Sequence, residues 1–444
     1  MKKLLCLLLA GALLALSAAP SALAAHYTNR ADELSDLGLF LGTGVGYALD
    51  RAPTRAEAAA ILVRLLGKET DALAGVYTHP FEDVPTWADD YVGYLFSHQL
   101  TNGVSATRFA PGDVCSAQMF AAFILRALGY SEAAGDFTYS GVLAFAEDLT
   151  LVDGRLLRDE FWRDQAVAAM YNALFTRRKG TSATLLETLA DEGAISADAA
   201  AALLDKAARL RALNAAISAD PVMRTDAAAL NLEASITVTD STPLSPSSEK
   251  IFSSGVSRWI YRAGQLEMEN RLTVHLGESD PAAYETAYYI KDGFLYLDTD
   301  GTRTYTSQDL SALSPAQPEM WRLQARSYLV DDIVRTSAPE GTRYTYATQA
   351  FSLDRQFALT LQALDIDIDT ASFDAWSELL FAPNGALRAI TTGVTVYADN
   401  LTASFSGTQT ITAYGSDVVV DFPDFTNWGE FVPDLDPDTA LPLA

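Results

Sequence analysis

The sequence predicts an α+β protein of two domains, with helices in its first half and strands in its second. Apolar residues recur at helical spacing from about Ala31 to Leu210. From Ala227 onward Thr, Tyr, Val, Phe and Ser become frequent, and apolar residues alternate with polar ones, as is typical of strands. The length of 444 residues fits two or three domains.

The first 24 residues have the features of a secretory signal peptide. Lys2 and Lys3 precede an apolar stretch from Leu4 to Leu16, and Ala22-Leu23-Ala24 offers small residues for cleavage. The apolar stretch is short for a membrane span of about 20 residues. We therefore expect a secreted protein of the cell wall or cell surface, without a membrane span after cleavage.

Charge and cysteine content narrow the possible partners. The formal net charge of −26 disfavours a nucleic acid partner, and an anionic polymer would have to be held by a local basic site. One cysteine, Cys115, remains after cleavage, so no internal disulfide framework is expected. Cys115 is predicted to pack as a small apolar residue.

A capped amphipathic helix is the clearest local signal in the first half. In the segment Pro53–Gly67, Thr54 is a natural N-cap, and Glu57 three residues later completes a capping box. Gly67 supplies a stop for the helix.

The same helical frame recurs twice, which indicates three tandem repeats. The segment Val114–Gly129 aligns Ser116 with Arg55 and Gln118 with Glu57. The segment Phe161–Leu174 places Arg163 at the position of Arg55. The repeats span about residues 29–67, 79–130 and 136–176, within a predicted domain of residues 25–180.

The segment His79–Tyr130 resembles one S-layer homology repeat. An Asp-Val-Pro turn and a Trp open one helix, and a Gly turn, a Phe-x-Pro loop and a second amphipathic helix follow. Thr54-Arg55-Ala56-Glu57 is similar to the Thr-Arg-Ala-Glu signature of that family. The resemblance implies an N-terminal all-α bundle with pseudo-threefold symmetry, whose grooves bind secondary cell-wall polysaccharide, often pyruvylated.

The resemblance also implies the glycan-binding residues Thr54, Arg55, Glu57, Trp87, Ser116, Gln118, Trp162 and Arg163. A guanidinium can form bidentate hydrogen bonds with a pyruvyl carboxylate, and a helix start would add free N–H donors. Both arginines could instead be ordinary surface charges. Glu57 could act only as a cap, Trp87 could only space two helices, and Trp162 cannot cap. Because Ser116 carries no charge, the second groove is expected to be weakened or lost.

The second half is predicted to be a curved antiparallel sheet with a few helices. A helical connector of residues 181–213 precedes this domain of residues 214–431, and residues 432–444 form an acidic tail predicted to be disordered. Segments Asp354–Leu364 and Asp374–Phe381 are predicted helices. The predicted strands are Leu230–Thr239, Ser257–Arg262, Gln265–His275, Tyr284–Ile290, Phe294–Asp298, Thr342–Ala350, Leu387–Val396, Ala403–Thr412 and Val418–Phe422.

The order of elements in this domain weakly resembles LolA/LppX-like half-barrel domains of exported bacterial proteins. A helix near Asn214, a strand hairpin reading AYYIKDGFLYLDTDGTRTYT and a closing DVVVDFPDF carry the resemblance. It implies a curved sheet around a helix, which in that family often holds an apolar ligand. A filled core without a ligand is the alternative.

No catalytic, cofactor or metal motif stands out. The sequence has no His-Glu-x-x-His pair, Cys-x-x-Cys or Gly-x-Ser-x-Gly. Asp365, Asp367 and Asp369 suit a strand better than a calcium loop, because Thr370 stands where an EF-hand needs Gly. We expect a non-enzymatic, cofactor-free wall anchor. An envelope carrier of an apolar molecule and a surface hydrolase with an unrecognised acid pair are the alternatives.

Overall fold

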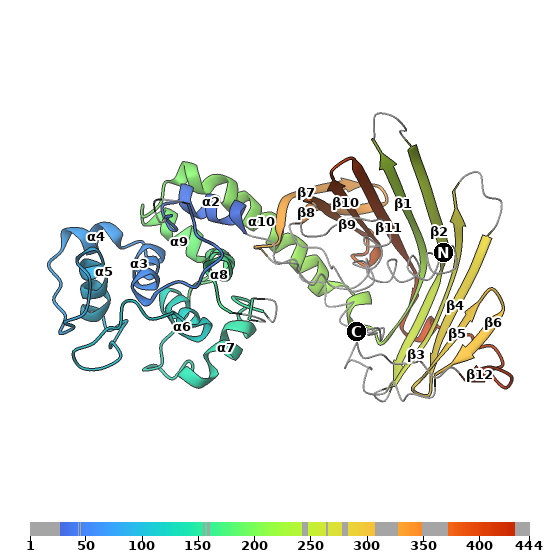
Figure 1. The fold of residues 1–444 in the computed structure, drawn as a ribbon, viewed down its shortest axis with the longest axis horizontal. Coiled ribbons are helices and arrows are strands. Elements are labelled where there is room, and N and C mark those ends of the chain that lie inside the picture. The colour runs from blue at the N-terminus through green and yellow to red at the C-terminus, as the bar shows by residue number, and fades with distance from the viewer. Residues whose placement is uncertain are drawn as a thin grey trace. The chain divides into compact units, whose positions relative to one another are not determined.

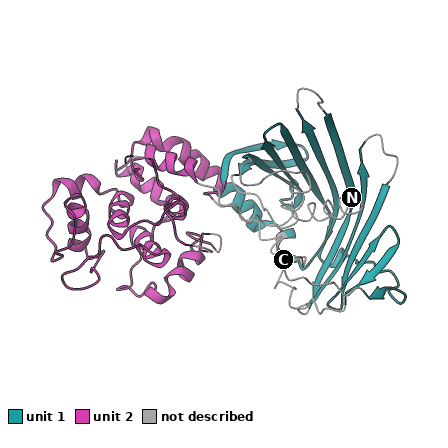
Figure 2. Cartoon of the chain, in the orientation of Figure 1, with its two compact units in different colours: residues 1–23, 211–325, 330–444 teal, residues 24–210, 326–329 magenta. Residues whose placement is uncertain are grey.

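The chain divides into two compact units (Figures 1 and 2). The N-terminal unit comprises residues 24–210 together with 326–329, and the sheet unit comprises residues 211–325 and 330–444. The computed structural model describes residues 27–42, 44, 46–153, 156–157, 160–241, 247–262, 265–277, 283–306, 327–348 and 372–430.

Short helices make up most of the N-terminal unit. Several have the side-chain caps that their sequences call for, including the predicted box of Thr54 and Glu57. No helix among the described residues has the length and apolar character needed to cross a membrane. The helices are α2 (Thr28–Asp36), α3 (Arg55–Leu65), α4 (Glu69–Ala74), α5 (Thr86–Ser97), α6 (Ala117–Ala127), η1 (Tyr139–Gly141), α7 (Val142–Asp148), α8 (Arg163–Phe175), α9 (Leu185–Asp191) and α10 (Ala197–Ala219), the last of which continues into the sheet unit.

The predicted fold class is wrong. One large mixed sheet dominates the structure, and an N-terminal all-α bundle with pseudo-threefold symmetry is not shown. The N-terminal unit also contains isolated β-bridges, such as Thr54 with Val114, and takes residues 326–329 from far along the chain. Helical periodicity identifies single helices but not the segments that pack between them, which is why the prediction failed.

The sheet has twelve strands in the order β12-β6-β5-β4-β3-β2-β1-β11-β10-β9-β8-β7 (Figure 1). Most neighbours are antiparallel, but β12 pairs in parallel with β6, so the predicted purely antiparallel sheet is also corrected. The strands are β1 (Ala227–Asp240), β2 (Ser247–Arg262), β3 (Gln265–Leu276), β4 (Ala283–Lys291), β5 (Phe294–Thr299), β6 (Thr302–Tyr305), β7 (Val330–Ala338), β8 (Gly341–Thr348), β9 (Ser372–Phe381), β10 (Leu387–Ala398), β11 (Leu401–Tyr414) and β12 (Gly429–Glu430). Two short 3-10 helices, η2 (Val222–Arg224) and η5 (Gly415–Asp417), accompany them.

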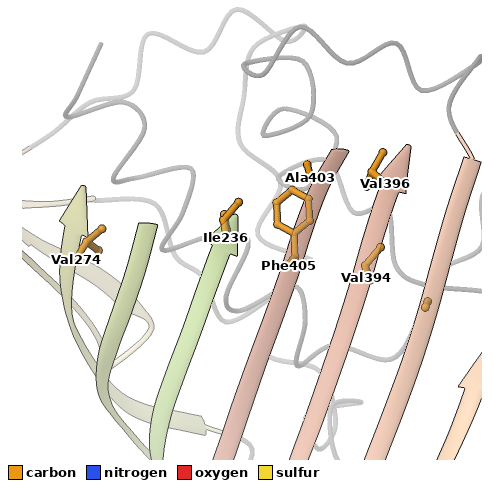
Figure 3. Close-up of a cluster of buried hydrophobic side chains, with 7 residues drawn as sticks. Ile236, Val274, Val394, Val396, Ala403 and Phe405 are labelled. Atoms are coloured by element: carbon orange, nitrogen blue, oxygen red, sulfur yellow. The ribbon is translucent and has the colours of Figure 1, made fainter. Parts of the chain in front are cut away.

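One face of the sheet carries an apolar cluster drawn from β1, β3, β9, β10 and β11 (Figure 3). Successive side chains of a strand point to opposite faces, so alternate residues of neighbouring strands meet there. Phe405 lies opposite both Ile236 and Val394 in the strand register. The buried members are Ile236, Val274, Ala375, Val394, Val396, Ala403 and Phe405.

The opposite face is crossed by residues 418–428, which we call the C-terminal strap. Val418 packs against Ala229 and Ile260, and the backbone N–H of Asp421 donates to the Glu269 carboxylate at 3.2 Å. Further along, Phe425 stacks on Tyr296 with ring centroids 3.8 Å apart. The strap leads directly into β12, so it extends the edge of the sheet beyond β6.

Two predicted elements of this unit are wrong, and others lie outside the described residues. Asp374–Phe381 is not a helix but lies in strand β9, whose inward residues alternate with outward ones. Val418–Phe422 is not a strand but part of the C-terminal strap. The predicted helix Asp354–Leu364, the segment Asp365–Thr370, the signal peptide and the tail after residue 431 lie outside the described residues.

Truncating Phe405 should destabilise the sheet unit strongly. Its side chain is 2% exposed, whereas Phe252 on β2 is 38% exposed. We expect Phe405→Ala to lower the free energy of unfolding by about 3–5 kcal/mol, because a cavity replaces a packed ring. Phe252→Ala, the matched control, should lower it by about 1 kcal/mol or less. Urea titration of both variants measures this, and equal losses would contradict the placement of the core.

Candidate functional site

The start of α3 is bound to the loop that joins α5 to α6, further along the chain. The backbone N–H of Arg55 donates to the Asp113 carbonyl at 2.9 Å, and that of Ala56 donates to the Pro111 carbonyl at 3.1 Å. The Glu57 N–H donates to the Thr54 hydroxyl at 3.3 Å. The expectation that this helix start offers free N–H donors to a ligand is therefore wrong, because the protein already uses them.

The Arg55 side chain packs against the same loop, and the residue is 8% exposed. Its Nε donates to the Phe109 carbonyl at 2.8 Å, and its guanidinium lies 4.9 Å from the centroid of the Phe109 ring. Its Nη1 donates to the weak acceptor Met119 Sδ at 3.8 Å, and to no other described residue. No ion pair of the described residues includes Arg55, so a nearly buried cation is left without a neutralising carboxylate.

Arg163 at the start of α8 repeats this geometry. Its Nε donates to the Tyr47 carbonyl at 2.8 Å, and its guanidinium lies 4.7 Å from the centroid of the Phe40 ring. Its backbone N–H donates to the Arg51 carbonyl at 2.7 Å, and the Asp164 N–H donates to the Leu49 carbonyl at 3.2 Å. Residues 47, 49 and 51 thus supply backbone carbonyls to the start of α8. Residues 109, 111 and 113 supply them in the same way to the start of α3.

The charge around the two arginines differs. Arg163 Nη1 lies 3.6 Å from Glu57 Oε1, and Arg51 also donates to Glu57, at 3.0 Å. Burial lowers the pKa of Arg163, and the negative charge of Glu57 opposes this. Burial alone would raise the pKa of Glu57, but hydrogen bonds from Arg51 and from the Thr54 N–H, with the charges of both arginines, leave it lowered. Arg163 is therefore partly neutralised, whereas Arg55 is not.

The other predicted site residues divide into two groups. Ser116 is exposed and caps α6 by accepting from the Met119 N–H at 3.3 Å, so the contact of Met119 with Arg55 brings it into the same neighbourhood. Gln118 donates to the Tyr139 carbonyl at 2.6 Å.

Two tryptophans complete the predicted set. Trp162 precedes Arg163, and its backbone N–H donates to Gln165 Oε1 at 2.8 Å. Its indole donates to Glu160 at 3.3 Å and, as expected, does not cap the helix. Trp87 is 54% exposed at the start of α5. Within the described part of the chain, no hydrogen bond or ring contact joins Trp87 to either arginine.

Sequence reasoning missed Asp83, which holds the loop in place. Its carboxylate accepts from the backbone N–H groups of Phe109 at 2.8 Å and Ala110 at 2.9 Å. The bond from Phe109 is the main cause of its lowered pKa. The Asp-Val-Pro turn marked Asp83 as a helix start, but nothing local shows that its partner lies 26 residues away. Nearby, Cys115 is buried as predicted, and burial raises the pKa of its thiol to about 12.

Comparisons with known proteins place the chain at the cell surface. A "Cell surface protein" of Thermoanaerobacter kivui is 35% identical over 122 residues, which cover 26% of this chain and 16% of that protein. A "Middle cell wall protein" of Brevibacillus brevis is 29% identical over 167 residues, covering 34% and 16%. A "Surface layer protein" of Brevibacillus choshinensis is 29% identical over 168 residues, covering 35% and 15%. The predicted cell-surface location is confirmed, although the chain spans only about a sixth of the length of these relatives.

Other comparisons contribute less. No protein-family model matches the chain. The ywiB protein from Bacillus subtilis is 8% identical with a TM-score of 0.15, over 42% of this chain and 94% of that one. A LolA superfamily protein from Nitrosomonas europaea is 9% identical with a TM-score of 0.16, over 48% and 94%.

Glu57 should make the stability of the N-terminal unit depend on pH. Because its pKa is lowered in the folded state, its contribution is complete above its ordinary pKa of about 4.3 and is lost as the pH falls through the folded value. Glu57→Gln keeps a capping side chain, as Gln165 does in α8. We expect this variant to melt about 2–5 °C below wild type at pH 7, and the gap to close toward pH 3. A gap that is the same at both pH values would contradict the role of the carboxylate.

Proposed function

We propose that the N-terminal unit holds the protein at the cell surface by binding an acidic secondary cell-wall polysaccharide, without covalent chemistry. The observation that carries the proposal is the nearly buried guanidinium of Arg55, which forms no ion pair with any described residue. The surface-protein names of the partial relatives support a wall-associated role but do not specify the ligand. The proposal concerns binding rather than catalysis.

The charge of Arg55 favours an anionic ligand. A buried charge is costly unless it is paired, and a guanidinium cannot shed its proton to avoid the cost. Arg55 uses Nε and Nη1 for protein contacts, and no described residue accepts from Nη2. The remaining donors lie in one plane and suit the two oxygens of a carboxylate, such as that of a ketal-linked pyruvate.

The protein as a whole would repel such a polymer. Because the protein has a net charge of −26, its overall field repels an acidic polymer. A local basic site must therefore attract the polymer. Arg163 lies in the same kind of loop, but Glu57 already takes part of its charge. We therefore assign Arg55 as the principal contact and Arg163, with Trp162 beside it, as the weaker one.

The remaining predicted residues have supporting roles in this proposal. The exposed Ser116 hydroxyl and the Thr54 hydroxyl can hydrogen-bond sugar near Arg55. Glu57 caps the start of α3, and Gln118 ties α6 to the Tyr139 carbonyl. The exposed indole of Trp87 offers a flat apolar face to a sugar ring.

Removing the Arg55 guanidinium should release the protein from wall material. We expect Arg55→Ala in the full chain to lower the affinity for purified sacculi by about tenfold or more, because a charge-assisted hydrogen bond is worth about 1.5–3 kcal/mol. Ser116→Ala should have a smaller effect. Arg209→Ala, which removes an exposed arginine of α10, is the control for net charge. Sedimentation of protein with sacculi measures each affinity.

Two further arms make the outcome decisive. Arg55→Lys keeps the charge but loses the planar fork, so it should bind between wild type and Arg55→Ala. Sacculi extracted with acid to remove polysaccharide should bind none of the variants well. Retention of Arg55→Ala equal to that of Arg209→Ala, with both proteins folded by circular dichroism, would refute the proposal.

A further inference from the structure

A three-residue segment of the second half of the chain lies inside the N-terminal unit. Ser327, Tyr328 and Leu329, which we call the plug, are 6%, 0% and 4% exposed. They are surrounded by residues of α2, α8 and the loop between α7 and α8. The plug is separated from Arg30, one of its partners, by 298 residues.

Three polar groups of the plug bond to groups in the N-terminal unit. The Tyr328 hydroxyl donates to Asp153 Oδ2 at 2.8 Å, and the Tyr328 carbonyl accepts from Arg30 Nε at 3.1 Å. The Ser327 hydroxyl donates to Asn172 Oδ1 at 2.6 Å. The ring of Tyr27 meets the ring of Tyr328 edge-on at 5.3 Å.

The receiving groups are held in position independently of the plug. The Asn172 amide donates through Nδ2 to the Leu151 carbonyl at 3.0 Å, which turns Oδ1 toward Ser327. Arg30 is fully buried, with its guanidinium 4.8 Å from the centroid of the Tyr171 ring and 2.7 Å from Glu33. A fixed acceptor, a fixed donor and a carboxylate thus converge on one short peptide.

The contact with Arg30 follows the pattern of the two arginines described above. Arg55 and Arg163 donate through Nε to the carbonyls of Phe109 and Tyr47, which belong to loops of the same stretch of chain. Arg30 also donates to the carbonyl of an aromatic residue, but this residue, Tyr328, comes from beyond β6. The plug supplies from 298 residues away the kind of carbonyl that loops 54 and 116 residues away supply to Arg55 and Arg163.

We propose that the N-terminal unit contains a peptide-binding site for a Ser-Tyr-aliphatic sequence, and that the chain fills this site with its own plug. Specificity comes from the Asp153 carboxylate, which selects a tyrosine hydroxyl, and from Asn172, which selects a hydroxyl one residue earlier. The N-terminal unit is complete only when the plug is bound. The proposal concerns contacts within that unit and is independent of glycan binding.

Hydrogen–deuterium exchange of the full chain tests the site without any wall material. In Tyr328→Ala, we expect the amides of α2 and α8 to exchange at least about tenfold faster than in wild type, because local opening becomes easier. Tyr328→Phe, which loses only the bond to Asp153, should give a smaller increase of about threefold to tenfold. Tyr397→Ala, which truncates a 43% exposed tyrosine of β10, should leave α2 and α8 unchanged.

A peptide added in trans separates a binding site from ordinary packing. We expect millimolar acetyl-Ser-Tyr-Leu-Val-amide to restore slow exchange in α2 and α8 of Tyr328→Ala, and acetyl-Ser-Ala-Leu-Val-amide to fail. Amides of β1 and β11 serve as the internal reference for the folded sheet. Unchanged exchange in Tyr328→Ala, or no recovery with the tyrosine peptide, would overturn the proposal, whatever the outcome of the sacculus experiment.

Discussion

The N-terminal unit depends on one repeated interaction, in which a buried arginine donates through Nε to a backbone carbonyl of an aromatic residue. Arg55, Arg163 and Arg30 all make it. The bond fixes a guanidinium against an aromatic ring and ties a helix to a segment distant in sequence. Because arginine stays charged wherever it is placed, each instance also sets the local electrostatics.

The three instances are neutralised to different degrees, which gives them different roles. Arg30 has Glu33 at 2.7 Å, and Arg163 has Glu57 at 3.6 Å. Among the described residues, Arg55 contacts a carbonyl, a thioether and the face of the Phe109 ring, but no carboxylate. The same local geometry can therefore have a mainly structural role at Arg30, whereas at Arg55 it leaves a positive charge that can attract an external anion.

Sequence reasoning succeeded where the deciding contacts are local. The capping box at Thr54 and most strands of the sheet depend on residues within a few positions, and both could be predicted. The segment Asp374–Phe381 was wrongly predicted as a helix because its apolar and polar residues do not alternate clearly in the sequence. Buried and exposed positions are set by pairing with the neighbouring strands. The predicted fold class was wrong for a related reason, since the packing of one segment against another cannot be predicted from either segment alone.

The candidate site shows the same division. The sequence identified Arg55 and Arg163, but their carbonyl partners in the loops, the role of Asp83 and the pairing of Glu57 with Arg51 all join residues whose proximity no motif records. The expected free donors at the helix starts were absent because a distant loop supplied their acceptors. Local motifs therefore predicted which residues carry charge, but not how much of that charge remains available.

The plug has a consequence for how the protein matures. A chain that crosses a membrane with its amino end first delivers residues 24–210 to the outside well before residue 328 follows. Until then, the N-terminal unit lacks the bonds that Tyr328 forms with Arg30 and Asp153. If the plug completes the N-terminal unit as proposed, this unit finishes folding only after residues 327–329 have crossed the membrane. A chain that stalls before that point would stay loosely folded and accessible to proteases.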